Sequence, residues 1–345
     1  QSLFCPEGNF QWVGLFRGQT EIPIVVVSHG GGSESLAGPL EDMTVELEKY
    51  VPVIVLLVDG DVALSEHSLK TVGGRIFSRT PSRLGFRDEF NLFRNAIKGA
   101  AMLIRDSVRA EPGPARRIRL RGAATSFRSI YSQRVAESIF IAYRELQATA
   151  VLSVFEGHAY ERLAFRLCHE SGNGALVAGY VQSGGYPDPF SVTWKLGHGY
   201  DPDLLCLTGT TPRAMMTDRV NLEELLVLGS GRELPQVVCR TRRSRCLLLP
   251  DAYPGELAVL LDFAQLLLAE SNDIEITLRL HPRQDSNRQL DRMMDELRNS
   301  PRFELSTNAL ADDLAQSRIA LYRGSTTAVI AAAAGLPVGF VGSDP

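Results

Sequence analysis

Apolar residues recur along this chain in two alternating patterns. Short continuous runs rich in Val, Leu and Ile, such as 22–28 and 51–58, are typical of strands that are buried on both faces. Longer segments carry apolar residues at helical spacing, as in 91–109 and 126–147. The alternation of buried strands with amphipathic helices predicts an α/β fold in which helices cover both faces of a parallel sheet.

The same pattern predicts the remaining elements. In the first part of the chain we expect strands at 74–78, 150–155, 175–181 and 203–207 and a helix at 158–170. In the second part we expect strands at 245–249, 274–280, 303–306, 318–322 and 337–341, with helices at 254–269, 286–299, 309–315 and 325–334. The aperiodic stretch 229–243 is expected to join two Rossmann-like domains, 1–235 and 236–345, that face each other across a ligand cleft.

Composition narrows the class of protein. A length of 345 residues suits two domains, and a net charge of −4 argues against a general nucleic-acid surface. No apolar run approaches the roughly 18 residues that a bilayer span needs. Five scattered cysteines without a close pair favour buried, inert thiols in a reducing cytoplasm. Because the chain begins at Gln1, we expect an excised piece or one domain of a longer protein.

Three polar segments each follow a predicted strand: "VFEGHAYER" at 154–162, "LRLHPRQD" at 278–285 and "LYRGSTTAV" at 321–329. In the third, Gly324 ends a strand and Ser325, Thr326 and Thr327 open a helix. Free backbone N–H groups and hydroxyls at that place favour phosphate binding. Plain N-capping by a hydroxyl explains the same residues equally simply.

In the second segment His281 ends the predicted strand, where Pro282 favours an extended backbone that directs the imidazole toward the edge of the sheet. An imidazole there can donate to a phosphate oxygen, and Arg279 shares its face. The alternative is a histidine that hydrogen-bonds a neighbouring loop.

Glu156 follows an apolar strand, where burying a carboxylate is costly unless it is paired or has a functional role. It could act as a general base toward an acceptor hydroxyl, or it could form an ion pair with Arg162. His158 and Arg162 lie four residues apart on the next helix, so they either contact an anionic substrate together or are surface groups.

Together the three segments resemble the bacterial sialyltransferase-like glycosyltransferases of the GT-B fold, a group that includes transferases for the keto-acid sugar Kdo. That group carries an acidic-acidic-Gly motif, then His-Pro, then a Ser-Ser or Ser-Thr pair. Here the order is Glu156-Gly157, His281-Pro282 and Ser325-Thr326, with separations of 125 and 44 residues. The first acidic position is Phe155, which leaves a single carboxylate.

The resemblance implies a metal-independent enzyme without a cofactor that transfers a 2-keto acid sugar from CMP to a glycan, glycolipid or glycoprotein. Glu156 would be the catalytic carboxylate, and His281, Ser325 and Thr326 would bind the phosphate of CMP. The donor carboxylate would contact the Gly-rich turns, at Gly30, Gly31 and Gly32 or at Gln182 and Ser183, for which tight connections are the alternative.

Residues 1–235 would then bind the acceptor and 236–345 the nucleotide. We expect no nucleic-acid partner and a cytoplasmic protein with at most peripheral contact with the inner face of the membrane. A UDP- or GDP-sugar transferase or epimerase of the same fold, and a two-domain binding protein without catalysis, remain alternatives. The arginines at 240, 242, 243 and 245 either face an anionic ligand or are solvated.

Overall fold

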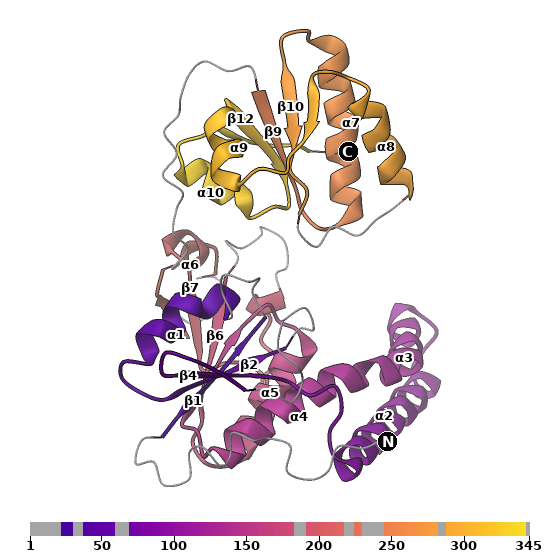
Figure 1. Cartoon of the computed structure of the whole chain (residues 1–345). Coiled ribbons are helices and arrows are strands. Elements are labelled where there is room, and N and C mark those ends of the chain that lie inside the picture. The colour runs from indigo at the N-terminus through magenta and orange to yellow at the C-terminus, as the bar shows by residue number, and fades with distance from the viewer. Residues whose placement is uncertain are drawn as a thin grey trace, which may run out of the picture. The chain divides into compact units, whose positions relative to one another are not determined.

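A computed structural model describes residues 22–29, 37–58, 69–182, 191–216, 224–229, 245–281 and 288–342. The chain divides into two compact units, Gln1–Arg232 and Glu233–Pro345 (Figure 1). The assignment of an acceptor role to the first unit and a nucleotide role to the second stays a prediction.

The first unit is built on an eight-stranded sheet with the order β3-β4-β2-β1-β5-β6-β7-β8. All described neighbours pair in parallel except β3, which forms an antiparallel hairpin with β4. The strands are β1 (Ile24–Ser28), β2 (Val53–Leu57), β3 (Lys70–Val72), β4 (Arg75–Arg79), β5 (Ala150–Val154), β6 (Leu176–Val181), β7 (Leu204–Leu207) and β8 (Leu225–Val227).

Helices cover both faces of this sheet, which explains the continuous apolar runs. Along β1, Val25 and Val27 pack with α4 and α5, whereas Val26 packs on the other face beside α1. The helices of this unit are η2 (Gly38–Leu40), α1 (Glu41–Leu47), α2 (Phe86–Arg109), α3 (Pro114–Thr125), η3 (Ser126–Arg128), α4 (Ser129–Glu145), α5 (Ala159–Glu170), η4 (Ser191–Thr193) and α6 (Thr210–Met216).

The second unit is a five-stranded parallel sheet with the order β11-β10-β9-β12-β13. Leu248 of its central strand packs against α7 and α8, and Leu247 and Leu249 pack against α9 and α10 on the opposite face. The elements are β9 (Arg245–Pro250), α7 (Pro254–Glu270), β10 (Glu275–Leu278), α8 (Arg288–Arg298), β11 (Phe303–Leu305), α9 (Leu310–Gln316), β12 (Ile319–Arg323), α10 (Thr327–Ala333) and β13 (Val338–Phe340).

The predicted α/β class with two parallel sheets is confirmed. Pro254 stands in the first turn of α7, as expected. Cys168, Cys206 and Cys246 are buried free thiols whose pKa values are raised by burial to about 12, 11 and 12, so they are unreactive as predicted. Among the described helices, none combines the length and the apolar character that a bilayer span requires.

Candidate functional site

The first sheet reverses its strand order beside β1. From β1 the chain moves outward to β2 and β4 on one side, and then returns to build β5, β6 and β7 on the other. In a parallel sheet, ligands bind outside the carboxyl ends of the strands at such a switch point. His29 directly follows β1, and Glu156 and His158 follow its neighbour β5.

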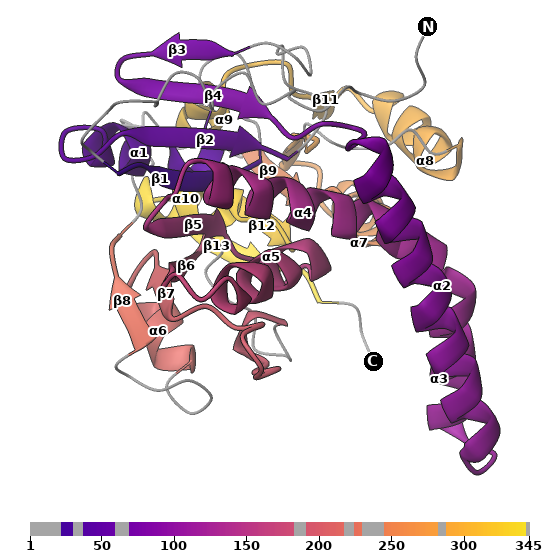
Figure 2. The same cartoon turned by 90° about the horizontal axis from the view of Figure 1, so that it is seen from below.

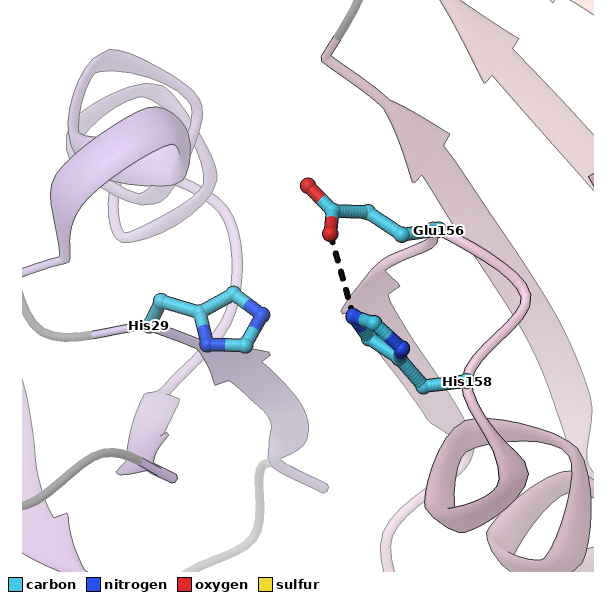
Figure 3. A group of neighbouring side chains, drawn as sticks. All are labelled: His29, Glu156 and His158. Atoms are coloured by element: carbon cyan, nitrogen blue, oxygen red, sulfur yellow. Dashed lines mark hydrogen bonds and ion pairs between the residues drawn. The ribbon is translucent and has the colours of Figure 1, made fainter. Parts of the chain in front are cut away.

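These three side chains form one cluster, with His29 on one side and the Glu156–His158 pair opposite it (Figure 3). His158 Nε2 donates to Glu156 Oε2 across 3.0 Å. Gln182, which follows β6, donates through its amide to Glu156 Oε1 at 2.7 Å. The hydrogen bond from His158, followed by that from Gln182, lowers the pKa of Glu156 to about 2 against the opposing effect of burial. Glu156 is therefore a carboxylate at neutral pH.

Tyr160 contacts the ring of His29, and a hydrogen bond from the preceding residue fixes the end of β1. The hydroxyl of Tyr160 lies 3.2 Å from His29 Nε2, and the Tyr160 ring stacks on that of His158 with 5.8 Å between the ring centroids. Ser28 Oγ donates to the carbonyl oxygen of Ala37 at 2.6 Å, which fixes the end of β1. Because a phenol hydroxyl both donates and accepts, Tyr160 can pair with either tautomer of the His29 ring.

The turn that carries Glu156 is built around Glu161, whose side chain is buried. Its carboxylate accepts the backbone N–H groups of Glu156 at 3.1 Å and of His158 at 2.8 Å, and it forms a capping box with His158 at the start of α5. Burial raises the pKa of Glu161 to about 7. Gly157 takes a φ of +81°, a conformation that glycine adopts without steric cost.

Arg162 is a buried structural residue. Its guanidinium pairs with Asp201 at 2.5 Å and donates to the carbonyl oxygens of Ser191 at 2.6 Å and Trp194 at 2.9 Å. The predicted alternative of an ion pair with Glu156 is therefore wrong, because Arg162 turns toward the segment 191–201. His158 and Arg162 do not share an exposed face either, since the His158 side chain is half exposed and Arg162 is buried.

The cluster could also hold a divalent cation. One ligand atom from each of His29, Glu156 and His158 lies within 4.8 Å of the others. Two imidazoles and a carboxylate suit zinc or iron(II). The expectation of a metal-independent site stays a prediction.

The second sheet has its own switch point, between β9 and β12. Gly324 follows β12 with a φ of +73°, and a Cβ at this position would lie 2.9 Å from Cβ of Asp251, which follows β9. His281 closely follows β10, on the other side of β9. The strand order thus brings the two predicted phosphate segments to the same edge of one sheet.

Three of the predicted phosphate-binding residues, Ser325, Thr326 and Arg279, differ in the hydrogen bonds that their side chains make. Ser325 is buried and its Oγ accepts the backbone N–H of Thr327 at 3.3 Å, whereas the side chain of Thr326 makes no capping hydrogen bond. Arg279 donates to the buried carboxylate of Asp313 at 2.9 Å and to the carbonyl oxygen of Asn308 at 2.7 Å. Phosphate binding by these residues stays a prediction.

Several predicted residues lie outside the described part of the chain: Gly30, Gly31, Gly32, Ser183 and Pro282, and the arginines at 240, 242 and 243. Arg245, the last of the basic group, lies on β9 and pairs with Glu275 and Glu304. Sequence reasoning missed His29, Tyr160 and Glu161 as parts of the cluster. His29 carried a usable signal, because it follows a buried strand as Glu156 does.

Neither a protein-family model nor a curated protein sequence matches the chain. Its structure is similar to UDP-N-acetylglucosamine 2-epimerase from Rickettsia bellii, with a TM-score of 0.52 and 11% identity over 92% of this chain and 78% of that one. It is also similar to a UDP-forming trehalose-phosphate synthase from Burkholderia xenovorans, with a TM-score of 0.52 and 12% identity over 93% and 83%. A structure described as trehalose-6-phosphate from E. coli bound with UDP-2-fluoro glucose has a TM-score of 0.51 and 13% identity over 92% and 83%. These likenesses establish the GT-B fold.

Proposed function

We propose that this chain is a nucleotide-sugar-dependent enzyme that uses a UDP- or GDP-activated sugar, as a transferase or an epimerase. The observation that carries the proposal is the cluster of His29, Glu156 and His158 at the switch point of the first sheet. A purely structural cluster would have no reason to lie at the sheet edge where ligands of such folds bind.

The chemistry of the cluster suits glycosyl transfer. In that reaction an acceptor oxygen bonds to the anomeric carbon, the bond to the nucleotide phosphate breaks, and the acceptor hydroxyl loses its proton. The ionised Glu156, oriented by two donors, stabilises positive charge that develops at the anomeric carbon. His29, beside the Tyr160 hydroxyl, takes the proton. An epimerase would use the same imidazole to move a proton on the sugar.

The nucleotide would bind in the second unit, at the loops that follow β9, β10 and β12. The rule for switch points favours this edge, and Gly324 permits close approach of the backbone to a phosphate. His281 follows β10 at this edge and would donate to a phosphate oxygen.

The names of the similar structures favour a UDP-sugar as the first donor to test. A second candidate is the transfer of a 2-keto acid sugar from CMP, which the order Glu156-Gly157, His281-Pro282, Ser325-Thr326 favours. The acceptor in that case would be a surface glycan or glycoconjugate. Both candidates use the same cluster and differ in the number of phosphates that the second unit holds.

The test is calorimetric titration of the full chain with UDP, GDP and CMP, with and without EDTA. We expect UDP or GDP to bind in EDTA, and His281→Ala to weaken binding about tenfold or more because a hydrogen bond to a charged phosphate is lost. His198 is an exposed histidine of the first unit outside the cluster, and His198→Ala is the control, which should bind as the wild type does.

Measurements of turnover test the catalytic role of the cluster separately from nucleotide binding. Glu156→Gln keeps the shape of the side chain but removes its charge, so it should lower kcat about a hundredfold while nucleotide affinity is retained. Selective binding of CMP would favour the second candidate. Failure of all three nucleotides to bind would overturn both, and binding that EDTA abolishes would refute the metal-independent reading.

A further inference from the structure

Helix α2 carries an exposed apolar stripe that runs along its whole length. The members recur every three or four residues or at multiples of that spacing, and each side chain is between 46% and 72% exposed: Phe86, Phe90, Phe93, Ile97, Ile104 and Val108. At about 100° per residue they fall within an arc of about 60° of the helix. From Phe86 to Val108 the stripe rises through about 22 residues, so it is about 33 Å long.

The apolar stripe is not the face by which α2 packs in its own unit. The buried residues of α2 are Leu92, Ala96 and Ser107, centred about 100° around the helix from the stripe. Helix α3 lies along α2 as the second half of a hairpin (Figure 2). Arg119 of α3 donates to the carbonyl oxygen of Asp106. The packing of α2 in its own unit therefore leaves these side chains about half exposed or more.

A basic stripe runs directly beside the apolar one. It consists of Arg87, Arg94, Lys98, Arg105 and Arg109, which occupy an arc of about 60° next to the apolar arc. Asp88 and Asp106 lie beyond it, whereas Glu89 lies on the face by which α2 packs and is held there by Arg134 of α4 at 2.6 Å. Apolar, basic and acidic positions are thus sorted around the helix.

Helix α3 extends this charge. It contains four arginines and no acidic residue. Over residues 86–128 there are ten Lys or Arg against four Asp or Glu, a net charge of +6, although the whole chain carries −4. The positive charge is therefore concentrated on the hairpin that carries the apolar stripe.

We propose that the α2–α3 hairpin binds an anionic lipid surface. A helix with bulky apolar residues on one face and Lys and Arg beside them lies in the plane of a bilayer interface, with its apolar face among the acyl chains. The basic stripe lies level with anionic head groups and is attracted to them. Long Arg and Lys side chains reach outward while their stems cover apolar surface.

The positive charge of the hairpin favours an anionic lipid surface over a second copy of the chain as the partner of the apolar stripe. Two copies packed through their apolar stripes would bring the adjacent basic stripes together, and the surplus of +6 on each hairpin would repel the other. An anionic bilayer removes that repulsion. The same argument favours a lipid surface with negative head groups over a neutral one.

The test is flotation of the full chain with phosphatidylcholine vesicles that contain phosphatidylglycerol, and with vesicles of phosphatidylcholine alone. We expect the protein to float with the first and weakly or not at all with the second. Added salt should weaken flotation, because it screens the basic stripe. No donor sugar is needed, so failure of the proposed function would leave this result unaffected.

Two pairs of variants assign the binding to the stripes. Ile97→Glu should lower the partition coefficient about tenfold or more, whereas Leu266→Glu, at an even more exposed leucine of α7, should not change it. Lys98→Gln should lower it about fivefold, and Lys70→Gln on the exposed strand β3 should leave it unchanged. Thermal unfolding at the wild-type temperature shows that each variant is folded.

Three results would overturn the proposal. One is wild-type protein that does not float with phosphatidylglycerol vesicles. Another is flotation that Ile97→Glu and Lys98→Gln leave intact. The third is a wild-type protein that is a dimer in light scattering, together with an Ile97→Glu variant that is a monomer, when neither floats with the vesicles. The apolar stripe would then bind a second copy of the chain.

Discussion

Replacing Arg162 tests whether this residue holds the site together or contacts a substrate. The guanidinium pairs with Asp201 and donates to two carbonyl oxygens of the segment 191–201. Ser191, at the start of that segment, donates in turn to the carbonyl oxygen of Glu156 at 2.5 Å. Arg162 therefore connects helix α5 to the turn that carries the catalytic carboxylate of the proposal.

Arg162→Ala should lower the free energy of unfolding because it leaves the carboxylate of Asp201 without its charged partner. Removing one partner of a buried ion pair costs roughly 3–5 kcal/mol. Asp201 is one fifth exposed and keeps the backbone N–H groups of Leu196 and Gly197, so the lower end applies. We expect a loss of about 3 kcal/mol in the free energy of unfolding. Arg162→Lys should lower the free energy of unfolding by about half as much, because an ammonium group keeps the charge but cannot make all the hydrogen bonds of the planar guanidinium.

Urea unfolding gives the change in free energy, and hydrogen exchange shows whether protection is lost at 191–201. Arg298→Ala is the matched control, because Arg298 pairs with Asp295 on the surface of α8 in the second unit, where an ion pair contributes at most about 0.5 kcal/mol. Asp201→Asn completes a double-mutant cycle. The reasoning fails if Arg162→Ala is as stable as the control but loses affinity for the nucleotide-sugar.

Two further predictions concern the same turn. Burial raises the pKa of Glu161 from 4.5 to about 7 in the folded protein, so the folded state binds this proton more tightly than the unfolded state does. The free energy of unfolding should therefore fall by up to about 3 kcal/mol as the pH rises from about 4.5 to about 7. Glu161→Gln should flatten this slope in unfolding measured at about pH 5 and about pH 8; an unchanged slope would rule the assignment out. Gly157→Ala should cost more than Gly172→Ala in thermal unfolding. Both glycines have positive φ, but only at 157 would the new Cβ lie 2.8 Å from the Cβ of Ser191.

The sequence predicted the central strands well and the edges poorly. Strands β2 and β9 are buried on both faces, so their apolar runs leave little choice of structure. Strand β3 is exposed along its length and has no such run. Helix α3 was missed because arginines occupy many of its positions and leave only a weak apolar period.

The cluster could be predicted only in part. Glu156, His158 and Gln182 follow adjacent strands, and the rule that such groups meet at one edge was available from the sequence. That His29 joins them depends on β5 pairing with β1, which the apolar pattern does not reveal. The partner of Arg162 lies 39 residues away, in a loop without any periodic signal, so proximity along the chain suggested Glu156 instead.

The turn also explains why two carboxylates five residues apart have opposite properties. Glu161 is buried, accepts backbone N–H groups and has its pKa raised by burial. Glu156 lies at the open edge, accepts two side-chain donors and has its pKa lowered by them. Environments that separate two pKa values in this way assign different tasks to the two groups. Glu161 shapes the turn, so its loss should appear in stability, whereas the loss of charge at Glu156 should appear in turnover while the fold is retained.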